Sequence, residues 1–187
     1  MSEIIAITGG IGSGKSQVLS ILEGAGEKVI SCDKITNDLY ENQTVKLKLA
    51  SIFPECDNEK TGVTKQAVAK IVFNDKAKLK TLTDFLTPLI LEESLSKAKA
   101  LGGRVFVEVP LLFECNAQNK FDKVLVVLRD KTQRVKSVIK RSNLSEQEVL
   151  KRIDSQFDYD SADLTPFVVI VNDGDLQTLK QKVLNLI

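Results

Sequence analysis

Five short apolar runs, rich in β-branched residues, alternate along the chain with segments whose apolar residues recur at helical spacing. Each run has about the length of a buried parallel strand, and the five cover Ile4–Ile7, Lys28–Ile30, Arg104–Val109, Lys123–Leu128 and Phe167–Val171. Such an alternation predicts an α/β fold with a five-stranded parallel sheet and helices on both faces. Because the chain has 187 residues and no linker-like stretch, we expect a single domain over residues 1–187.

Two of the helical segments carry clear apolar faces. The first follows residue 14 and would end at Gly24 or Gly26, with its face formed by Val18, Leu19, Ile21 and Leu22. A longer helix is expected over residues 75–100, with a stripe formed by Leu79, Leu82, Leu86, Leu89 and Ile90. Proline lacks a backbone N–H and its ring clashes with the preceding turn, so we expect Pro88 to break or kink this helix near Thr87.

Further local signals lie elsewhere in the chain. Ser145 followed three residues later by Glu148 is a capping-box signature, which predicts the start of a helix. Residues 175–183 are typical of a last helix, and the stretch from Cys56 to Gly62 is the clearest surface loop.

The strongest motif is the glycine-rich stretch Gly9–Ser16, which matches the phosphate-loop pattern G-x-x-x-x-G-K-[ST] directly after the first apolar run. Glycine is needed there because backbone N–H groups must turn inward around phosphate oxygens. We expect Lys15 to meet the outer phosphates, Ser16 to offer a hydroxyl to Mg²⁺, and the following helix to direct its positive end at the anion. The alternative is a glycine-rich turn without function. The motif predicts that ATP phosphates lie against Gly10, Ile11, Gly12, Ser13, Gly14, Lys15 and Ser16.

Two carboxylates follow other predicted strands. Asp33 comes after the second apolar run and Glu108 falls at the end of the third. Ligands collect at the carboxyl ends of parallel strands, so both carboxylates are expected on the same edge of the sheet as the loop. Asp33 suits a base that accepts the proton of an acceptor hydroxyl, or it caps a helix beginning at Lys34. Glu108 suits a residue that positions Mg²⁺ through water, or it is an ordinary charge at a strand end.

Composition narrows the classes of partner. The chain has 26 Lys and Arg against 25 Asp and Glu, a net charge of +1, which argues against a broad basic surface for nucleic acid. Aromatic residues are 5% of the chain and Trp is absent, which leaves little for stacking against bases. No apolar run approaches the roughly 18 residues that span a bilayer, and the chain begins with a strand rather than a signal peptide. We therefore expect no nucleic-acid partner and no membrane partner.

The cysteines indicate the compartment. Cys32, Cys56 and Cys115 are widely spaced, form no C-x-x-C pair, and occur in a chain without histidine, so a zinc site of the usual kind is excluded. We expect reduced thiols in a cytoplasmic protein, which would act as a monomer or weak oligomer.

Five motifs occur in the order found in dephospho-CoA kinases. They are ITGGIGSGKS at Ile7–Ser16, the element that ends at Asp33, TPLI at Thr87–Ile90, VPLLFE at Val109–Glu114 and R-I-x-x-Q at Arg152–Gln156. The chain resembles this family along nearly its whole length, and the loop together with PLLFE is far more specific than the loop alone. The resemblance implies a P-loop kinase-type three-layer sandwich with a helical acceptor-side insertion over about residues 34–100 and a lid over about residues 141–163.

The resemblance also implies an activity and a set of roles. The activity is transfer of the γ-phosphate of ATP, with Mg²⁺, to the ribose 3′-hydroxyl of dephospho-CoA, the last step of coenzyme A synthesis. Lys15, Asp33 and Arg141 would be catalytic, with Asp33 as the base and Arg141 near a lid over ATP. Acceptor-side contacts would come from Asp33, Leu111, Leu112 and Glu114, and the adenine pocket from Asn172 and Gly174.

The chain departs from the family pattern at several positions. The family usually has an acidic residue, an arginine, a histidine and a lid arginine where this chain has Ser31, Asn37, Thr87 and Ser137. Arg134 is a candidate substitute for the last of these. Residues 157–163 are acidic where the family tends to be basic, which is unfavourable beside a triphosphate unless the carboxylates face away.

Two other functions stay open on these grounds. One is a nucleotide-binding protein of the same fold with weak or lost kinase activity. The other is a kinase for a different small hydroxyl acceptor, against which the PLLFE match argues.

Overall fold

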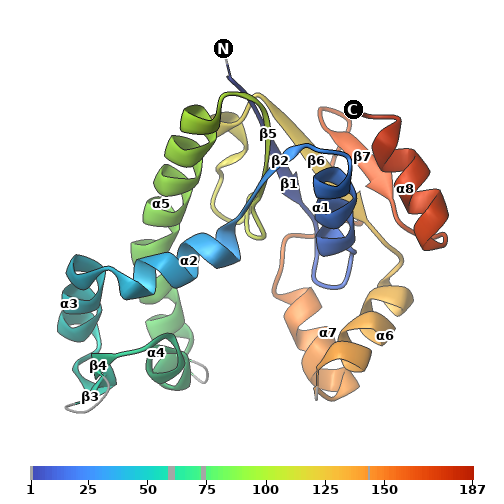
Figure 1. The fold of residues 1–187 in the computed structure, drawn as a ribbon. Helices are drawn as coiled ribbons and strands as arrows, with labels where there is room; N and C mark the ends of the chain where they lie inside the picture. The colour runs from blue at the N-terminus through green and yellow to red at the C-terminus, as the bar shows by residue number, and fades with distance from the viewer. Residues whose placement is uncertain (1, 59–61, 73–74, 143) are drawn as a thin grey trace. The chain divides into compact units, whose positions relative to one another are not determined.

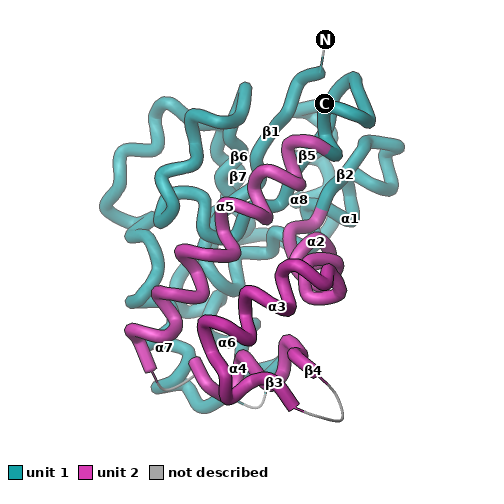
Figure 2. The backbone as a smooth tube through the Cα atoms, turned by 90° about the vertical axis from the view of Figure 1, so that its left-hand side faces the viewer, with its two compact units in different colours: residues 1–30, 97–187 teal, residues 31–96 magenta. Residues whose placement is uncertain are grey.

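The computed structural model describes residues 2–58, 62–72, 75–142 and 144–187. The chain divides into two compact units (Figure 2). The first unit comprises residues 1–30 and 97–187, and the second comprises residues 31–96. The second unit thus covers nearly the same residues as the insertion expected at about 34–100.

A five-stranded sheet carries the phosphate loop (Figure 1). Its strand order is β2-β5-β1-β6-β7, with β1 in the centre. The pairs β1–β5, β1–β6 and β6–β7 are parallel, so the predicted parallel sheet is confirmed. The strands are β1 (Ser2–Thr8), β2 (Lys28–Ser31), β5 (Gly103–Glu108), β6 (Lys123–Leu128) and β7 (Val168–Val171), and they match all five predicted runs.

Two helices cover one face of this sheet, α1 (Lys15–Gly24) and α8 (Leu176–Leu184). Their buried residues Val18, Leu22 and Leu179 form one apolar cluster with strand residues such as Ile7 and Val127. The opposite face is also buried, as expected for strands apolar at nearly every position. The expected first and last helices are therefore confirmed within one residue at each end, with Asp175 as the N-cap of α8.

A second pair of helices lies C-terminal to β6. Helix α6 (Lys131–Arg141) and helix α7 (Glu146–Asp154) pack through their own apolar cluster of Val135, Val138, Val149 and Ile153. Both reciprocal hydrogen bonds of the capping box between Ser145 and Glu148 are formed, which confirms the predicted start of α7. A short 3₁₀ turn, η2 (Gln118–Lys120), precedes β6.

The second unit is mainly helical. Its elements are α2 (Cys32–Glu41), α3 (Gln43–Ile52), the 3₁₀ turn η1 (Pro54–Cys56), the strands β3 (Asp57–Asn58) and β4 (Gly62–Val63), α4 (Lys65–Val72) and most of α5 (Lys76–Leu101). The strands β3 and β4 form a small antiparallel pair that the sequence did not predict. Of the surface loop expected over 56–62, residues 59–61 lie outside the described residues.

Helix α5 corrects one expectation. It runs unbroken over 26 residues with Pro88 inside it, so of the break or kink predicted near Thr87, the break is wrong. A proline costs an interior helix position about 3 kcal/mol, but Leu86 before it and Leu89 and Ile90 after it pack into the same core. That shared burial outweighs the lost hydrogen bond. The expected stripe holds except at Leu79, which is exposed.

Within the ranges given above, no helix is both long and apolar enough to cross a membrane.

Candidate active site

The loop between β1 and α1 has a backbone that only glycine adopts readily. Gly12 and Gly14 have φ angles of 79° and 100°, in the left-handed region. A Cβ added to Gly12 would lie 2.6 Å from the carbonyl oxygen of Arg134, and one added to Gly14 would overlap the side-chain amide of Asn172. The glycines are therefore required both by conformation and by close packing against two later parts of the chain.

Three side chains from the C-terminal half hold the backbone of this loop. The Oε1 atom of Gln156 accepts a hydrogen bond from the Ile11 N–H at 2.7 Å, and the Nε atom of Arg134 donates to the Ile11 carbonyl at 3.0 Å. The Nδ2 atom of Asn172 donates to the Ser13 carbonyl at 2.8 Å. Arg134 and Asn172 are only 5% and 4% exposed. These bonds fix the peptide groups on either side of Gly12.

Lys15 lies folded over the loop. Its Nζ donates to the carbonyl oxygens of Gly9 at 2.6 Å and Gly10 at 3.2 Å. The pKa of Lys15 is lowered to about 8, chiefly by burial and also by the positive charges of Arg141 and Arg134, while the carboxylates of Glu108 and Glu114 oppose the shift. The ammonium is thus held in a poorly solvated position that an anion would favour.

The electrostatic surroundings of Lys15 bring several predicted residues together. Glu108 is the last residue of β5, as predicted, and exerts the largest favourable charge effect on Lys15. Arg141 is the exposed last residue of α6 and also acts on Lys15. Within the first unit, the loop lysine, the strand-end glutamate and the predicted lid arginine therefore share one electrostatic environment.

The two serines of the loop differ in exposure. Ser13 is 1% exposed, and its Oγ is buried without a hydrogen-bond partner in the described parts of the chain. Ser16 is exposed in the first turn of α1. Its hydroxyl therefore belongs to the N-terminal end of the helix, where the first backbone N–H groups have no partner within the helix.

Asp33 lies in the first turn of α2, two residues beyond the end of β2. The N-cap of α2 is Ser31, so the alternative in which Asp33 caps a helix starting at Lys34 is wrong. The helix begins earlier because Cys32 and Ile35 are both buried and extend its apolar face. The Asp33 carboxylate is exposed, and it forms no hydrogen bond or ion pair with any residue that the structure describes.

The PLLFE element divides between the interior and the surface. Leu112 is completely buried, whereas Leu111 is 40% exposed. The Glu114 carboxylate accepts a hydrogen bond from the Phe157 N–H at 2.9 Å. Phe113 packs against Phe157, Tyr159 and Phe167, with ring centroids 4.5 to 5.9 Å apart. The element is therefore joined to the segment that follows α7.

That segment, Phe157–Asp160, alternates between inward and outward side chains. Tyr159 is buried, and its hydroxyl lies 3.2 Å from the Thr8 Oγ1 at the end of β1, while Asp158 and Asp160 are exposed. Asp158 accepts hydrogen bonds from its own turn, at Asp160 and Ser161. The acidic side chains thus face solvent, and the charge of Asp160 still acts on the buried Arg134 guanidinium.

Sequence reasoning assigned no role to Tyr159, and named Gln156 only as part of a motif. The alternating pattern Phe-Asp-Tyr-Asp is a local signal that could have placed Tyr159 inward. Arg134 was expected in the lid as a substitute for the arginine absent at Ser137. It is instead buried against the loop, where burial lowers its pKa while its guanidinium stays protonated.

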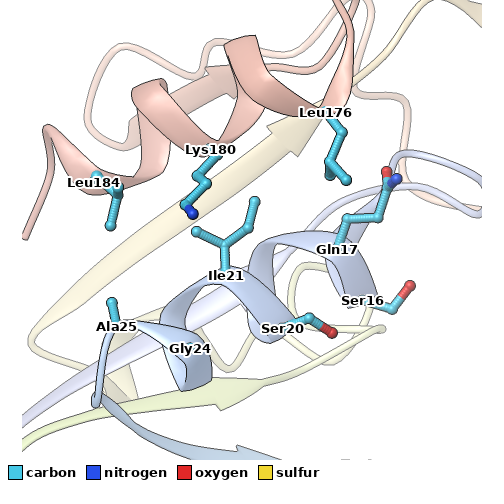
Figure 3. Close-up of a pocket in the computed structure, with 9 residues that line it drawn as sticks. All are labelled: Ser16, Gln17, Ser20, Ile21, Gly24, Ala25, Leu176, Lys180 and Leu184. Atoms are coloured by element: carbon cyan, nitrogen blue, oxygen red, sulfur yellow. The ribbon is translucent and has the colours of Figure 1, made fainter.

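The residues predicted for the adenine pocket lie after β7. Asn172 is buried with its amide on the loop, and Gly174 lies against Thr178 in the first turn of α8. A cavity of about 640 Å³ opens between α1 and α8, with Ser16 and Gln17 at one end and Ala25 and Leu184 at the other (Figure 3). Of the predicted site residues, its lining includes Ser16 alone.

The packing of Gly12 gives a direct test of the loop. We expect Gly12→Ala to lower the thermal unfolding midpoint and, with Mg-ATP, to reduce ligand-induced stabilisation, because the added Cβ meets the Arg134 backbone in a left-handed conformation. Gly24→Ala is the matched control, since no atom lies within 4 Å of its added Cβ. Differential scanning fluorimetry of both variants measures the effect. Equal midpoints and equal shifts would contradict the packing account.

Comparison with known proteins assigns the family. The sequence profile of dephospho-CoA kinases matches residues 3–178. A dephospho-CoA kinase of Helicobacter pylori is 34% identical over 188 residues, which cover 98% of this chain and 95% of that protein. A crystal structure from Thermus thermophilus aligns with a TM-score of 0.80 at 34% identity, covering 99% of this chain and 96% of that one. The dephospho-CoA kinase structure from Campylobacter jejuni aligns with a TM-score of 0.71 at 28% identity, covering 100% and 96%. This chain belongs to the dephospho-CoA kinase family.

Proposed function

We propose that this protein transfers the γ-phosphate of ATP to the ribose 3′-hydroxyl of dephospho-CoA. The observation that carries the proposal is the held glycine loop with Lys15 folded over it, in a chain of this family. Phosphoryl transfer needs little covalent chemistry from a protein and depends on positioning and charge stabilisation. A loop whose backbone is fixed in advance by three side chains suits that requirement.

The phosphates of ATP would replace the carbonyl groups that Lys15 now contacts. The N–H groups of the loop from Gly10 to Ser16 would surround the phosphate oxygens, and the Lys15 ammonium would counter the charge that develops on the transferred group. Arg141, exposed at the end of α6, would reach the same phosphates. The adenine would lie toward Gly174, with Asn172 supporting the loop.

The residues present fit a magnesium ion. The part of the chain that the structure describes holds no group of three or more acidic, cysteine or histidine side chains arranged for a metal. Magnesium in nucleotide sites typically takes only one or two protein ligands and completes its shell with phosphates and water. Ser16 would be a direct ligand, and Glu108 would act on the ion through water. When bound, the ion would neutralise charge on the phosphates.

Asp33 is the proposed general base. Its carboxylate is exposed and unpaired by the residues described, so it is available to a ligand. It would orient the acceptor hydroxyl and take its proton late in transfer. The acceptor would contact Leu111 through its exposed side chain, while Leu112 supports the turn from inside and Glu114 holds the segment after α7. The insertion over residues 34–100 would bind the rest of the acceptor.

We further propose a cytoplasmic location and a monomer or weak oligomer. The structure shows no disulfide bond among the residues it describes, and two of the three cysteines are buried, which suits a reducing compartment. The net charge of +1 and the absence of Trp disfavour a nucleic-acid partner.

One competition assay tests the acceptor. The protein is incubated with Mg-ATP and an equal mixture of dephospho-CoA, adenosine and gluconate, and the products are identified by mass spectrometry. We expect phosphorylated dephospho-CoA as the dominant product. A dominant product from adenosine or gluconate would overturn the acceptor assignment. Binding of ATP with no transfer to any acceptor would indicate a nucleotide-binding protein that has lost the activity.

The role of Asp33 is tested by its isosteric amide. Asp33→Asn should lower kcat by about 10² to 10⁴-fold with little change in ATP affinity, because a positioned base acts on transfer rather than on donor binding. Asp38→Asn, at another exposed position of the same helix, is the matched control and should keep most of the activity. A kcat for Asp33→Asn near that of the control would remove Asp33 from the chemistry.

The shifted pKa of Lys15 predicts proton uptake when ATP binds. With a pKa of about 8 in the free protein, most Lys15 side chains are neutral at about pH 8.5, and a neighbouring triphosphate favours the ammonium form. Binding should therefore take up a large fraction of a proton at about pH 8.5 and very little at about pH 7. Isothermal titration calorimetry in two buffers of different ionisation enthalpy measures this uptake. Lys15→Arg, which stays protonated, should show none, and wild-type protein without uptake would place the phosphates away from Lys15.

A further inference from the structure

Ile11 is held by three independent contacts. Its N–H donates to Gln156, its carbonyl accepts from Arg134, and its side chain packs against the apolar cluster of α6 and α7. We call Ile11, Arg134 and Gln156 the Ile11 clamp. Gln156 lies 145 positions from Ile11 in the sequence and Arg134 lies 123 positions away. The clamp therefore joins the phosphate loop to α6, which contains Arg134, and to the segment after α7, which contains Gln156.

We infer that Gln156 is a positioning residue that sets the conformation of the phosphate loop for ATP, acting through the Ile11 peptide group. The inference rests on the proposed function in that ATP is the ligand of the loop. Gln156 itself would touch no phosphate. Its effect passes through one backbone hydrogen bond.

The geometry explains why this bond matters for the loop. Ile11 directly precedes Gly12, whose left-handed backbone turns the following N–H groups toward the phosphates. Glycine has more accessible backbone conformations than any other residue type. The loop therefore needs contacts from outside to select one conformation at Gly12. The bond from Gln156 holds the peptide unit on the N-terminal side of Ile11, and the bond from Arg134 holds the unit on the C-terminal side.

The two side chains of the clamp that bond to the Ile11 backbone are not equivalent. Arg134 is a buried cation, and its removal would leave a cavity and change the charge around Lys15. Gln156 is a neutral, half-buried side chain whose only described hydrogen bond is to Ile11. Replacement of Gln156 by another neutral side chain therefore isolates the positioning effect from electrostatics.

Two substitutions separate the hydrogen bond from the packing. Gln156→Met keeps the length of the side chain and removes the acceptor oxygen, whereas Gln156→Glu keeps an acceptor at the same reach. Gln147→Met is the matched control, because Gln147 is exposed on α7 and its side chain forms no hydrogen bond with any residue that the structure describes. Each variant is assayed with the full-length protein.

We expect Gln156→Met to weaken ATP affinity and raise the KM for ATP by about three- to tenfold, the range for loss of one hydrogen bond. The KM for dephospho-CoA should stay within about twofold, since the clamp acts on the donor loop. Gln156→Glu keeps the acceptor but adds a negative charge beside the loop, so its recovery is measured as slow exchange of the loop in the ligand-free protein rather than as ATP affinity. Gln147→Met should match the wild-type protein. A purely structural role would lower the unfolding midpoint without separating the two KM values.

Hydrogen–deuterium exchange gives a readout that needs no activity. In the ligand-free protein, peptides covering residues 9–16 should exchange faster in Gln156→Met than in wild-type or Gln147→Met protein. If no acceptor is phosphorylated by the wild-type protein, the proposed function fails while exchange and ATP affinity still decide the inference. Unchanged exchange in the loop together with unchanged ATP affinity in Gln156→Met would overturn it.

Discussion

The structure of the site depends on the close packing of a glycine loop against side chains from the far end of the chain. The loop can approach Arg134 and Asn172 only because Gly12 and Gly14 lack a Cβ, and those two residues then hold carbonyl groups on either side of Gly12. Glycine thus contributes twice, through its backbone freedom and through the space it leaves. The cost of that freedom is conformational entropy, which the three hydrogen bonds to the loop offset.

This packing also determines the state of Lys15. A loop fixed in a tight turn directs two carbonyl oxygens toward its centre, and Lys15 satisfies them while it remains largely out of water. Burial lowers the pKa of Lys15, so the free protein holds its lysine in an environment that disfavours the ammonium. An anion bound at the same point would relieve that cost. On the proposed function, the free state is therefore preorganised for a phosphate.

Much of the fold could be predicted from local patterns, and the site only in part. All five strands of the sheet followed from short apolar runs, and the start of α7 from one serine and one glutamate. The uninterrupted α5 could not be predicted, because the burial that outweighs Pro88 comes from the tertiary core. The sequence singled out Arg134, Gln156 and Asn172, but not their role in holding the loop. They lie 123, 145 and 159 positions from their partners, and a single backbone hydrogen bond leaves no local signal at such separations.

The central claim is that the loop already has its nucleotide-binding conformation before ATP arrives. A crystal structure of the protein with Mg²⁺, a non-hydrolysable ATP analogue and dephospho-CoA tests it directly. The account predicts that Lys15 Nζ leaves the Gly9 carbonyl for a phosphate oxygen, while the hydrogen bonds of Ile11 and Ser13 to Gln156, Arg134 and Asn172 remain. A nucleotide bound away from the loop, or a loop that releases these three bonds to bind it, would contradict the account.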